Sequence, residues 1–553
     1  MSNRYRRTSF DGRARASMTG LGERCRVERT AVVRKLRVGI VDLVAKGPTH
    51  SLYAKFMHAN LASIMPQVLA VWCEEAGHDV NLVCYTGLEN LVEELPEDID
   101  ILFVGSFSQS AQIAYAISAM FRARGVVTCI GGPHARCYPQ DAQKYFDYVF
   151  GFTDKAVLNE VLEDCQPHRP IGEIRSAETQ PHALPGVRER WKYIEPTIEK
   201  APSALKIIPM LGSLGCPYTC SFCIDSVVKY QPLDFEVMRD DLRFLLTKVK
   251  NPVVGWHDPN FGVRFDDCIG AIEEAVPPGS IRFVAESSLS LLPEDRVKRL
   301  AKNGFQAILP GIESWYMLGN KSKSRNKHGL DKMRQVSEHT NQIARHISYI
   351  QTNFVLGLDC DEGPEPFELT KQFIDASPAA FPGYSLLTSF GQAAPLNLTH
   401  QEEGRVLGFP FHFLNNNHAM NLKPKGYEWV EFYDHVIDLT KYSFSKRAIW
   451  NRLRANRGGV QKALNVVRAI SSEGNGRIKY YSTVRDHLES DSKFRDYFEG
   501  ESDILPEFFV DRVRHELGPM WEFLPEGALE HDQNAYLKST GQKVEEPAQA
   551  AAV

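Results

Sequence analysis

The sequence predicts an α/β protein: a doubly wound, Rossmann-like parallel sheet, then a partial (β/α)6 TIM barrel, then a mostly helical C-terminal region. Two observations support this class. Short apolar segments alternate with segments of helical periodicity over residues 36–165 and again over 205–399, which is typical of βαβ units with helices on both faces. The chain has 553 residues, of which 43% are hydrophobic, and this is enough apolar material for at least two cores.

The first alternating region, residues 36–165, is expected to fold as one doubly wound domain. Such sheets bind ligands at the carboxyl ends of their strands, where glycines let the backbone approach a ligand. No G-x-G-x-x-G motif is present, so a dinucleotide is not the favoured ligand. The expected strands are 36–43, 81–85, 98–105, 126–130 and 148–152, the helices are 59–77 and 109–124, and the glycines at strand ends are Gly47, Gly105, Gly131 and Gly132.

Residues 166–204 contain several prolines and few periodic apolar positions, and we expect them to form a linker. The second alternating region, 205–399, supplies six βα-like units. A full TIM barrel has eight, so an open or partial barrel fits better. The expected strands are 206–211, 252–256, 281–286, 304–312, 347–358 and 384–388, with helices over 233–250, 266–275, 292–303, 329–345 and 365–376.

Residues 400–540 are expected to be a mostly helical domain, and the two ends, 1–35 and 541–553, to be disordered tails, the first of them basic. The net charge of −5 gives no bulk field that favours nucleic acid or an anionic membrane. No apolar run approaches the roughly 18 residues of a membrane helix, and no signal peptide is recognisable. We therefore expect a cytoplasmic protein whose 11 cysteines serve as thiols or ligands rather than in disulfides.

The stretch GSLGCPYTCSFCIDS, residues 212–226, holds three cysteines directly after the first predicted barrel strand: Cys216, Cys220 and Cys223. Thiolates are the standard ligands of iron–sulfur clusters, and three of them leave one iron of a 4Fe–4S cube open to an external ligand. A structural zinc site would need a fourth ligand, which His257 could supply from the next strand end. A disulfide would leave an odd thiol.

The spacing C-x3-C-x-Phe-C, in which Phe222 precedes the last cysteine, resembles the signature of the radical S-adenosylmethionine (AdoMet) superfamily. The resemblance implies a 4Fe–4S cluster held by the three cysteines, with AdoMet chelating the open iron through its amino and carboxylate groups. The reduced cluster then cleaves AdoMet to a 5′-deoxyadenosyl radical. The resemblance also implies a low-potential electron donor such as flavodoxin or ferredoxin.

Later strand ends resemble the AdoMet-binding segments of this superfamily. His257 and Asp258, in WHDPNF, stand where relatives place a polar strand end near the AdoMet amino group. Glu313 and Ser314, in GIES, resemble the strand end beside the adenosine, and residues 354–358, FVLGL, resemble the following strand end. Taken alone, an Asp or Glu at a strand end is more often a cap or a solvated side chain, but the order and spacing of these segments after the cysteine loop favour the joint interpretation.

A doubly wound domain before such a barrel resembles the cobalamin-binding, class B methylase-like subgroup. Ser106 after the third strand, and Gly131 and Gly132 after the fourth, match loops by which relatives hold the corrin. His134 follows in the same loop and is either a corrin contact or an ordinary loop histidine.

Two segments depart from the subgroup's pattern. Val44 replaces the histidine of the D-x-H-x-x-G loop, which implies cobalamin bound without a histidine ligand below the cobalt. The segment GFTD, residues 151–154, replaces a GEGE segment after the fifth strand, so the resemblance does not carry that corrin contact over to this chain.

The resemblance implies methylation of an unactivated carbon in a small-molecule or lipid substrate. Two alternatives stay open: a cyclisation or rearrangement with the same cofactors and no methyl transfer, and a non-catalytic cobalamin or redox sensor. The intact cysteine triad argues against the sensor, because a binding module needs no radical generator.

The C-terminal region offers two features that could meet a substrate. An aromatic cluster could line an apolar pocket, and a set of basic residues could meet an anion. The simpler interpretations are ordinary core for the first and a solvated helix face for the second. The aromatic residues are Phe409, Phe411, Phe413, Trp429, Phe432 and Tyr433, and the basic residues are Lys423, Lys425, Arg447, Arg452 and Arg454.

Overall fold

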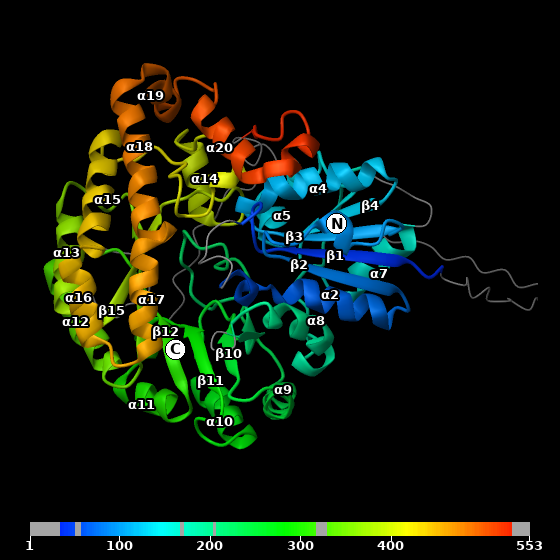
Figure 1. Cartoon of the computed structure of the whole chain (residues 1–553), viewed down its shortest axis with the longest axis horizontal. Helices are drawn as coiled ribbons and strands as arrows, with labels where there is room; N and C mark the ends of the chain where they lie inside the picture. Colours follow the sequence, from blue (N-terminus) through cyan, green and yellow to red (C-terminus); the bar gives the residue numbers. More distant parts are fainter. Residues whose placement is uncertain (1–33, 50–56, 166–170, 203–205, 317–328, 533–553) are drawn as a thin grey trace, which may run out of the picture. The chain divides into compact units, whose positions relative to one another are not determined.

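The computed structural model describes residues 34–49, 57–165, 171–202, 206–316 and 329–532 (Figure 1). The tails expected over 1–35 and 541–553 lie outside these ranges, apart from Arg34 and Lys35. Within the described part, two parallel sheets and a set of C-terminal helices account for the architecture.

The first sheet has six strands in the order β2-β1-β3-β4-β5-β6, and all neighbours are parallel. The order reverses between β1 and β3, which confirms the doubly wound prediction and places the ligand crevice at the carboxyl ends of these strands. The strands are β1 (Arg37–Leu43), β2 (Asp79–Tyr85), β3 (Ile101–Ser106), β4 (Val127–Gly131), β5 (Tyr148–Phe150) and β6 (Glu173–Arg175).

Both faces of this sheet are covered because its strands are apolar on both sides. On β3, Ile101 and Phe103 pack with the cluster of α2 (Ile64–Glu75) and α7 (Lys155–Asp164), while Leu102 and Val104 pack with the cluster of α4 (Ala111–Ala123). Side chains alternate across a strand, so consecutive apolar residues supply both faces. In Figure 1 the helix α4 lies above the sheet and α2 below it.

The linker expected over 166–204 is instead partly structured. Its residues include β6, which extends the first sheet, and α8 (Val187–Glu199), which packs Trp191 and Ile194 into the core. The sequence signal for both is weak. The strand has only three residues, with charged ends at Glu173 and Arg175, and the helix contains Pro196.

The second sheet runs β7-β10-β11-β12-β14-β15, with the short β13 also beside β14, and every pair is parallel. No pairing joins β7 to β15 among the described residues, so the barrel is open, as predicted. The strands are β7 (Ile207–Met210), β10 (Val253–Trp256), β11 (Arg282–Glu286), β12 (Phe305–Leu309), β13 (Gly311–Glu313), β14 (Tyr349–Leu356) and β15 (Ala380–Leu386).

Two strand predictions in the barrel need correction. The fourth expected strand, 304–312, is divided at Pro310 into β12 and β13, and the Pro310 carbonyl accepts from the Asn353 amide at 3.0 Å. The last expected strand begins at Ala380 rather than at residue 384. The helices follow the prediction closely: α9 (Phe235–Lys248), α10 (Phe265–Ala275), α11 (Glu294–Lys302), α12 (Gly329–Ala344) and α13 (Glu365–Ala376).

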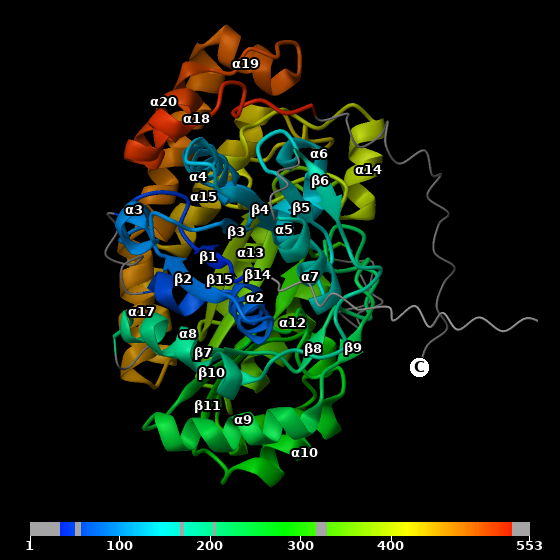
Figure 2. The same cartoon turned by 90° about the vertical axis from the view of Figure 1, so that its right-hand side faces the viewer.

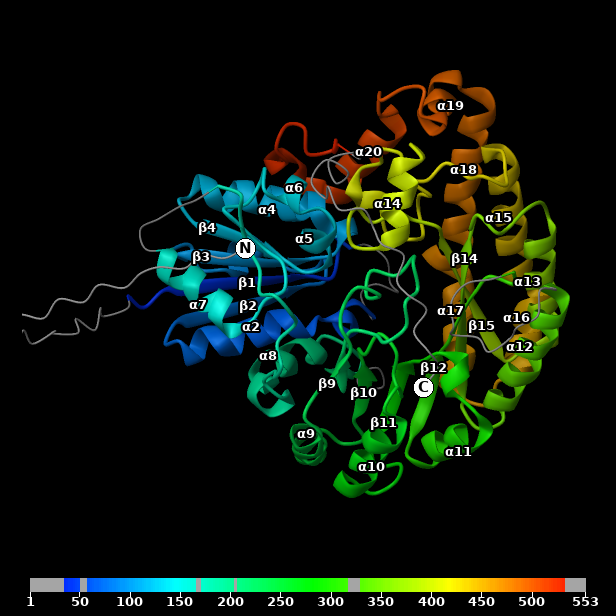
Figure 3. The ribbon, with the colours of Figure 1, turned by 180° about the vertical axis from the view of Figure 1, so that it is seen from behind.

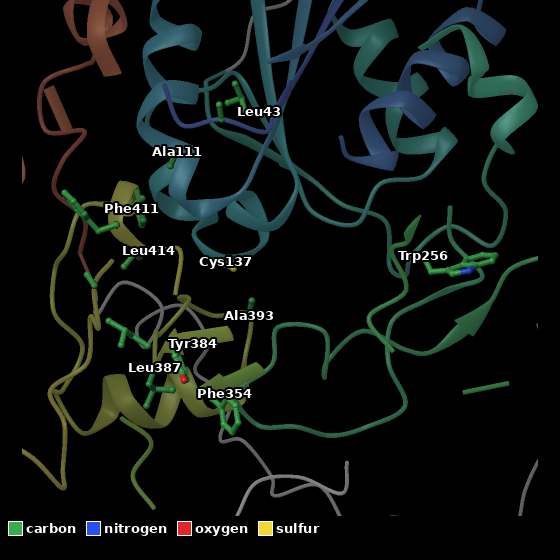
Figure 4. Packing of buried hydrophobic residues seen from close by; sticks show 14 of the residues in the cluster. Leu43, Ala111, Cys137, Trp256, Phe354, Tyr384, Leu387, Ala393, Phe411 and Leu414 are labelled. Carbon is green, nitrogen blue, oxygen red and sulfur yellow. The ribbon is translucent and has the colours of Figure 1, made fainter. Parts of the chain in front are cut away.

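The C-terminal part is mostly helical, as expected, and packs on both sheets (Figure 2). One buried apolar cluster contains Leu43 of the first sheet, Phe354 of the barrel and Phe411 of the C-terminal part (Figure 4). The aromatic cluster of the C-terminal region is entirely buried, which confirms its interpretation as core. The helices are α14 (Pro395–Glu402), α15 (Trp429–Ser443), α16 (Lys446–Ala455), α17 (Gly459–Ile470), α18 (Arg477–Ser490), α19 (Ser492–Glu499) and α20 (Glu507–Leu517).

Across the described ranges, no helix has both the length and the apolar character that crossing a membrane requires.

Candidate active site

The three cysteines lie on one closed loop between β7 and α9. The short strands β8 (Ser213–Leu214) and β9 (Gln231–Pro232) pair antiparallel and close the loop at its base. Gly215 has a φ of +66°, and a Cβ there would lie 2.5 Å from the Lys229 carbonyl oxygen, so this tight turn requires glycine.

Backbone hydrogen bonds shape the inside of the loop. The Cys223 amide donates to the Cys220 carbonyl at 3.0 Å, and the Ser226 hydroxyl donates to the Cys223 carbonyl at 2.7 Å. Cys216 and Cys220 are buried, and Cys223 is half-buried. The loop therefore presents three thiols from a short, internally bonded segment at the carboxyl end of the first barrel strand.

Asp258 fixes the base of this loop. It follows β10, the neighbour of β7, and its carboxylate accepts from the Gly212 amide at 2.9 Å and from the Ser213 hydroxyl at 2.5 Å. The side chain is 5% exposed, and burial raises its pKa to about 6. The resemblance implies a place for Asp258 near the AdoMet amino group, whereas both of its carboxylate oxygens accept hydrogen bonds from the cysteine loop.

The donor set fits an iron–sulfur cluster better than a single ion. The described residues contain no group of three or more His, Cys, Asp or Glu side chains that could hold one metal ion, so the zinc alternative with His257 has no geometric support. Each cysteine of a 4Fe–4S cluster binds a different iron, and the thiolates therefore do not converge on one point.

Two further predicted residues, His257 and Glu313, lie at strand ends on the same barrel edge. His257 follows β10 with an exposed side chain, and its amide donates to the Met210 carbonyl at 2.8 Å. Glu313 ends β13 with a φ of +65°, a conformation that is strained for a residue with a Cβ. A Cβ at Gly311 would lie 2.2 Å from a Glu313 carboxylate oxygen, so the carboxylate folds back over that strand.

Ser314 is buried, and its side chain and carbonyl form hydrogen bonds with neighbouring residues. Its hydroxyl donates to Asp361 at 2.8 Å and accepts from the Tyr316 amide at 3.2 Å, while the Lys332 ammonium donates to its carbonyl. Burial raises the pKa of Asp361 to about 6 and lowers the pKa of Lys332. Ser314 therefore supports the strand end from within rather than facing a ligand.

The structure brings Ser106, Gly131 and Gly132 together at the carboxyl edge of the first sheet. Gly105 pairs with Gly131 across β3 and β4, which places Ser106 beside the β4 end. Gly132 has a φ of +92°, and a Cβ there would lie 2.9 Å from the Ser106 carbonyl oxygen. The Ser106 hydroxyl donates to the Phe107 carbonyl at 2.9 Å.

Large apolar side chains are exposed along this edge. Phe107 after β3 is 47% exposed, Leu88 after β2 is 53% exposed, and Leu61, in the segment between β1 and α2, is 56% exposed. The three strands concerned are neighbours, so the loops that follow them share one edge of the sheet. Exposed apolar side chains at a ligand edge are typical of a surface that a ligand covers.

His134 and the loop after β1 face protein rather than the crevice. His134 is fully buried, its Nε2 lies 2.6 Å from the Tyr115 hydroxyl, and burial lowers its pKa to about 3. In the loop after β1, where Val44 stands at the usual histidine position, the Lys46 ammonium pairs with Glu516 of α20 at 2.7 Å. The role of His134 is thus structural.

The two carboxyl edges are tied to each other by Arg136 of α5 (Pro133–Cys137), the helix that follows Gly132. Its guanidinium donates to the Ile224 carbonyl at 3.0 Å, one residue beyond Cys223, and lies 4.0 Å from the Asp225 carboxylate. The guanidinium also stacks over Phe152 of the GFTD segment, 5.3 Å from the ring centroid. No local sequence signal marks Arg136, because its partners are distant in sequence.

Comparisons with known proteins agree with this arrangement, although no family model matches the chain. Bacteriochlorophyllide d C-12(1)-methyltransferase of Chlorobaculum tepidum is 24% identical over 375 residues, 66% of this chain and 80% of that protein. Bacteriochlorophyllide d C-8(2)-methyltransferase of the same organism is 21% identical over 404 residues, 70% of this chain and 87% of its own length.

Among solved structures, the cobalamin-dependent AdoMet radical enzyme OxsB with aqua-cobalamin bound aligns with a TM-score of 0.51 at 12% identity. The alignment covers 89% of this chain and 80% of OxsB. The sheet, the open barrel and their order along the chain are thus those of a known enzyme architecture. The chain is therefore similar in fold to a cobalamin-dependent AdoMet radical enzyme and similar in sequence to two methyltransferases of bacteriochlorophyllide d.

Proposed function

We propose that this protein is a cobalamin-dependent radical AdoMet methyltransferase that methylates an unactivated carbon of a small molecule. The observation that carries the proposal is the closed three-cysteine loop at the carboxyl edge of the open barrel, tied through Arg136 to the carboxyl edge of the doubly wound sheet. Both curated relatives are named as methyltransferases of bacteriochlorophyllide d, which favours methyl transfer over cyclisation.

Cys216, Cys220 and Cys223 would hold the 4Fe–4S cluster. When bound, the cluster supplies the electron that cleaves AdoMet, and cobalamin carries the methyl group. The chain's own contribution is to fix the loop and to exclude water: Asp258 anchors the loop base, and two of the three thiols are buried. Burial of the thiols also limits their reaction with solvent oxidants.

Glu313 and His257 are the groups that we assign to AdoMet. Both stand at carboxyl strand ends of the barrel, where the chemistry of such barrels gathers. The Glu313 carboxylate can accept hydrogen bonds from the ribose hydroxyls, and the backbone strain at this residue is of the kind that persists at functional sites.

Ser106, Gly131 and Gly132 are the backbone positions that we assign to the corrin. The neighbouring exposed side chains Leu61 and Phe107 would pack against its apolar surface. We further propose a low-potential donor such as flavodoxin or ferredoxin, and a reducing cytoplasmic setting that preserves the cluster.

Mass spectrometry of the AdoMet products tests this function. The protein is purified without oxygen, its cluster is rebuilt, and cobalamin, AdoMet and a low-potential reductant are supplied. We expect 5′-deoxyadenosine together with S-adenosylhomocysteine, and we expect neither product with Cys220→Ala. Formation of 5′-deoxyadenosine with no S-adenosylhomocysteine, in the presence of a carbon substrate that is consumed, would replace the methyltransferase by a cyclase or rearrangement enzyme.

A further inference from the structure

Three arginines surround β15, the edge strand of the open barrel. Arg452 of α16, Arg468 of α17 and Arg477 of α18 contact this strand or its side chains. Glu473, between α17 and α18, pairs with Arg468. Figure 3 shows α17 beside β15, with α12 and α16 on the other side of the strand.

Arg468 is a fully engaged cation. It is 8% exposed, stacks on the Phe381 ring at 3.6 Å from the centroid, and donates to Glu473, to Tyr349 and to Gln351, the last at 2.7 Å. This guanidinium is already paired with a carboxylate, and its hydrogen bonds hold the side chains of Tyr349 and Gln351 in place.

Arg452 is buried without a counter-charge. It is 1% exposed and donates to the Ser443 carbonyl at 2.5 Å, but its Nε and Nη1 groups have no hydrogen-bond partner among the described residues. It lies 5.5 Å from the Phe381 ring, on which Arg468 also stacks. A buried charge that lacks a partner is strongly unfavourable, so such a group signals that an anion completes the site. The sequence pattern favours a solvated helix face for Arg452, and this prediction is wrong because the side chain is buried.

Arg477 faces a cavity and contacts only neutral oxygens. Its guanidinium donates to the Tyr384 carbonyl at 3.2 Å and to the Asn417 amide oxygen at 3.0 Å, and no described carboxylate forms a salt bridge with it. The cavity has a volume of about 190 Å³. Its lining includes Gln351, Asn353, Gly383, Asn417, Arg468 and Arg477, and also Glu473, whose carboxylate is paired with Arg468.

Amide side chains and a glycine complete the cavity on the strand side. Gln351 donates to Asn353 at 2.9 Å, and both side chains are half-buried on the face of β14 that is turned away from the α13 core. Gly383 pairs with Asn353 on the neighbouring strand, and a Cβ there would lie 2.6 Å from the Asn353 amide oxygen. The absence of a side chain at Gly383 therefore keeps both amides in place and the cavity open.

We infer that this cavity binds a carboxylate of the substrate, with Arg477 as its direct partner, Asn353 and Gln351 as amide donors, and Arg452 as the buried charge behind them. Arg452 and Arg477 have no carboxylate partner among the described residues, and an incoming carboxylate balances this positive charge. The inference rests on the proposed function and narrows it: the methylated molecule carries a carboxylate that anchors it along β15.

Ligand-observed NMR on the anaerobic, cluster-loaded full chain tests this site without knowledge of the substrate. Sodium butyrate and its neutral analogue butyramide are the probes, since both are small enough for the cavity. We expect butyrate to bind at least tenfold more tightly than butyramide. Arg477→Gln should weaken the binding of butyrate by tenfold or more. Arg447→Gln changes an exposed arginine of α16 that is paired with Asp375, and it should leave the affinity for butyrate unchanged.

A competition experiment separates the two possible sources of a carboxylate. AdoMet should bind Arg477→Gln as tightly as the wild type and should not displace butyrate, because its own carboxylate belongs at the cluster. Displacement of butyrate by AdoMet would overturn the inference, as would equal binding of butyrate and butyramide. These outcomes are distinct from failure of the proposed function, because the NMR measurement needs no turnover and 5′-deoxyadenosine formation is assayed separately.

Discussion

Arg136 donates a hydrogen bond to the Ile224 carbonyl at 3.0 Å, and this contact connects the loop after β4 of the first sheet to the cysteine loop of the barrel. The residue before Ile224 is Cys223, so a charged side chain from one proposed cofactor edge lies next to a ligand of the other. The contact is reinforced by Gln392, which donates to the Arg136 carbonyl at 3.3 Å. The position of one loop therefore depends on the position of the other.

Loss of the Arg136 charge is expected to make the cluster harder to reduce. In Arg136→Gln, a positive charge near Cys223 disappears, and the midpoint potential should fall by an amount on the order of 40 mV. EPR-monitored redox titration measures this shift. Arg124→Gln serves as control, because Arg124 is exposed at the end of α4 and stacks on Phe121. An equal shift in both variants would show that Arg136 has no specific effect on the cluster.

Corrin binding should depend on the space at Gly132. Gly132→Ala places a Cβ 2.9 Å from the Ser106 carbonyl oxygen and forces the two loops apart, so cobalamin uptake should fall several-fold while iron content is retained. Gly125→Ala is a matched control: its φ of +85° imposes similar backbone strain, but its Cβ would meet no atom within 4 Å. Absorbance of the bound corrin reports the uptake. Equal uptake by both variants would show that the corrin does not bind at Gly132.

Glu313 is expected to lower the stability of the fold through its backbone conformation and to strengthen AdoMet binding through its carboxylate. Glu313→Gly relieves a φ of +65° that costs a residue with a Cβ about 1 kcal/mol, so the variant should unfold at a higher temperature than the wild type. The same change removes the carboxylate and should weaken AdoMet binding tenfold or more. Calorimetric titration with AdoMet and thermal unfolding measure the two effects. An unaltered AdoMet affinity would exclude Glu313 from the site.

The buried carboxyl of Asp361 predicts a pH dependence of stability. Burial raises its pKa in the folded protein to about 6, above the value of about 3.9 of an unfolded chain, so the folded state binds the proton more tightly. This contribution to stability is fully present below about pH 4 and is lost as the pH rises through about 6, at a cost of up to about 3 kcal/mol at neutral pH.

Asp361→Asn removes that cost but keeps an acceptor for the Ser314 hydroxyl. The variant should therefore be more heat-stable than the wild type at pH 7.5, and its advantage should narrow towards pH 5. Thermal unfolding at the two pH values checks this prediction. An advantage of the same size at both pH values would mean that the carboxyl of Asp361 does not titrate in this range.

Local sequence signals predicted most of the architecture. The parallel strands of both sheets are buried apolar runs bounded by turn residues, and the cysteine spacing is a local motif, so both can be recognised without tertiary information. The strand β6 could not be predicted, because it has only three residues, of which the first and last are charged. The helix α8 could not be predicted either, because Pro196 interrupts its helical pattern, and burial of its apolar face stabilises it nonetheless.

The roles of individual polar residues were harder to predict from the sequence. Asp258 looks like a ligand-facing strand end, but its partners Gly212 and Ser213 lie more than 40 positions away, and only the pairing of β7 with β10 brings them together. Arg452 looks like its solvated neighbour Arg454, and only the turn of α16 over the edge strand buries one and leaves the other exposed.

The most direct test of the central claim is an EPR spectrum of the reduced, reconstituted protein before and after addition of AdoMet. Three cysteines leave one iron of a 4Fe–4S cluster open, so AdoMet should bind that iron and change the g-values of the reduced cluster. Cys223→Ala should give no such cluster signal. A 4Fe–4S signal that AdoMet does not alter, or one that persists in Cys223→Ala, would contradict the assignment of these three cysteines to an AdoMet-binding cluster.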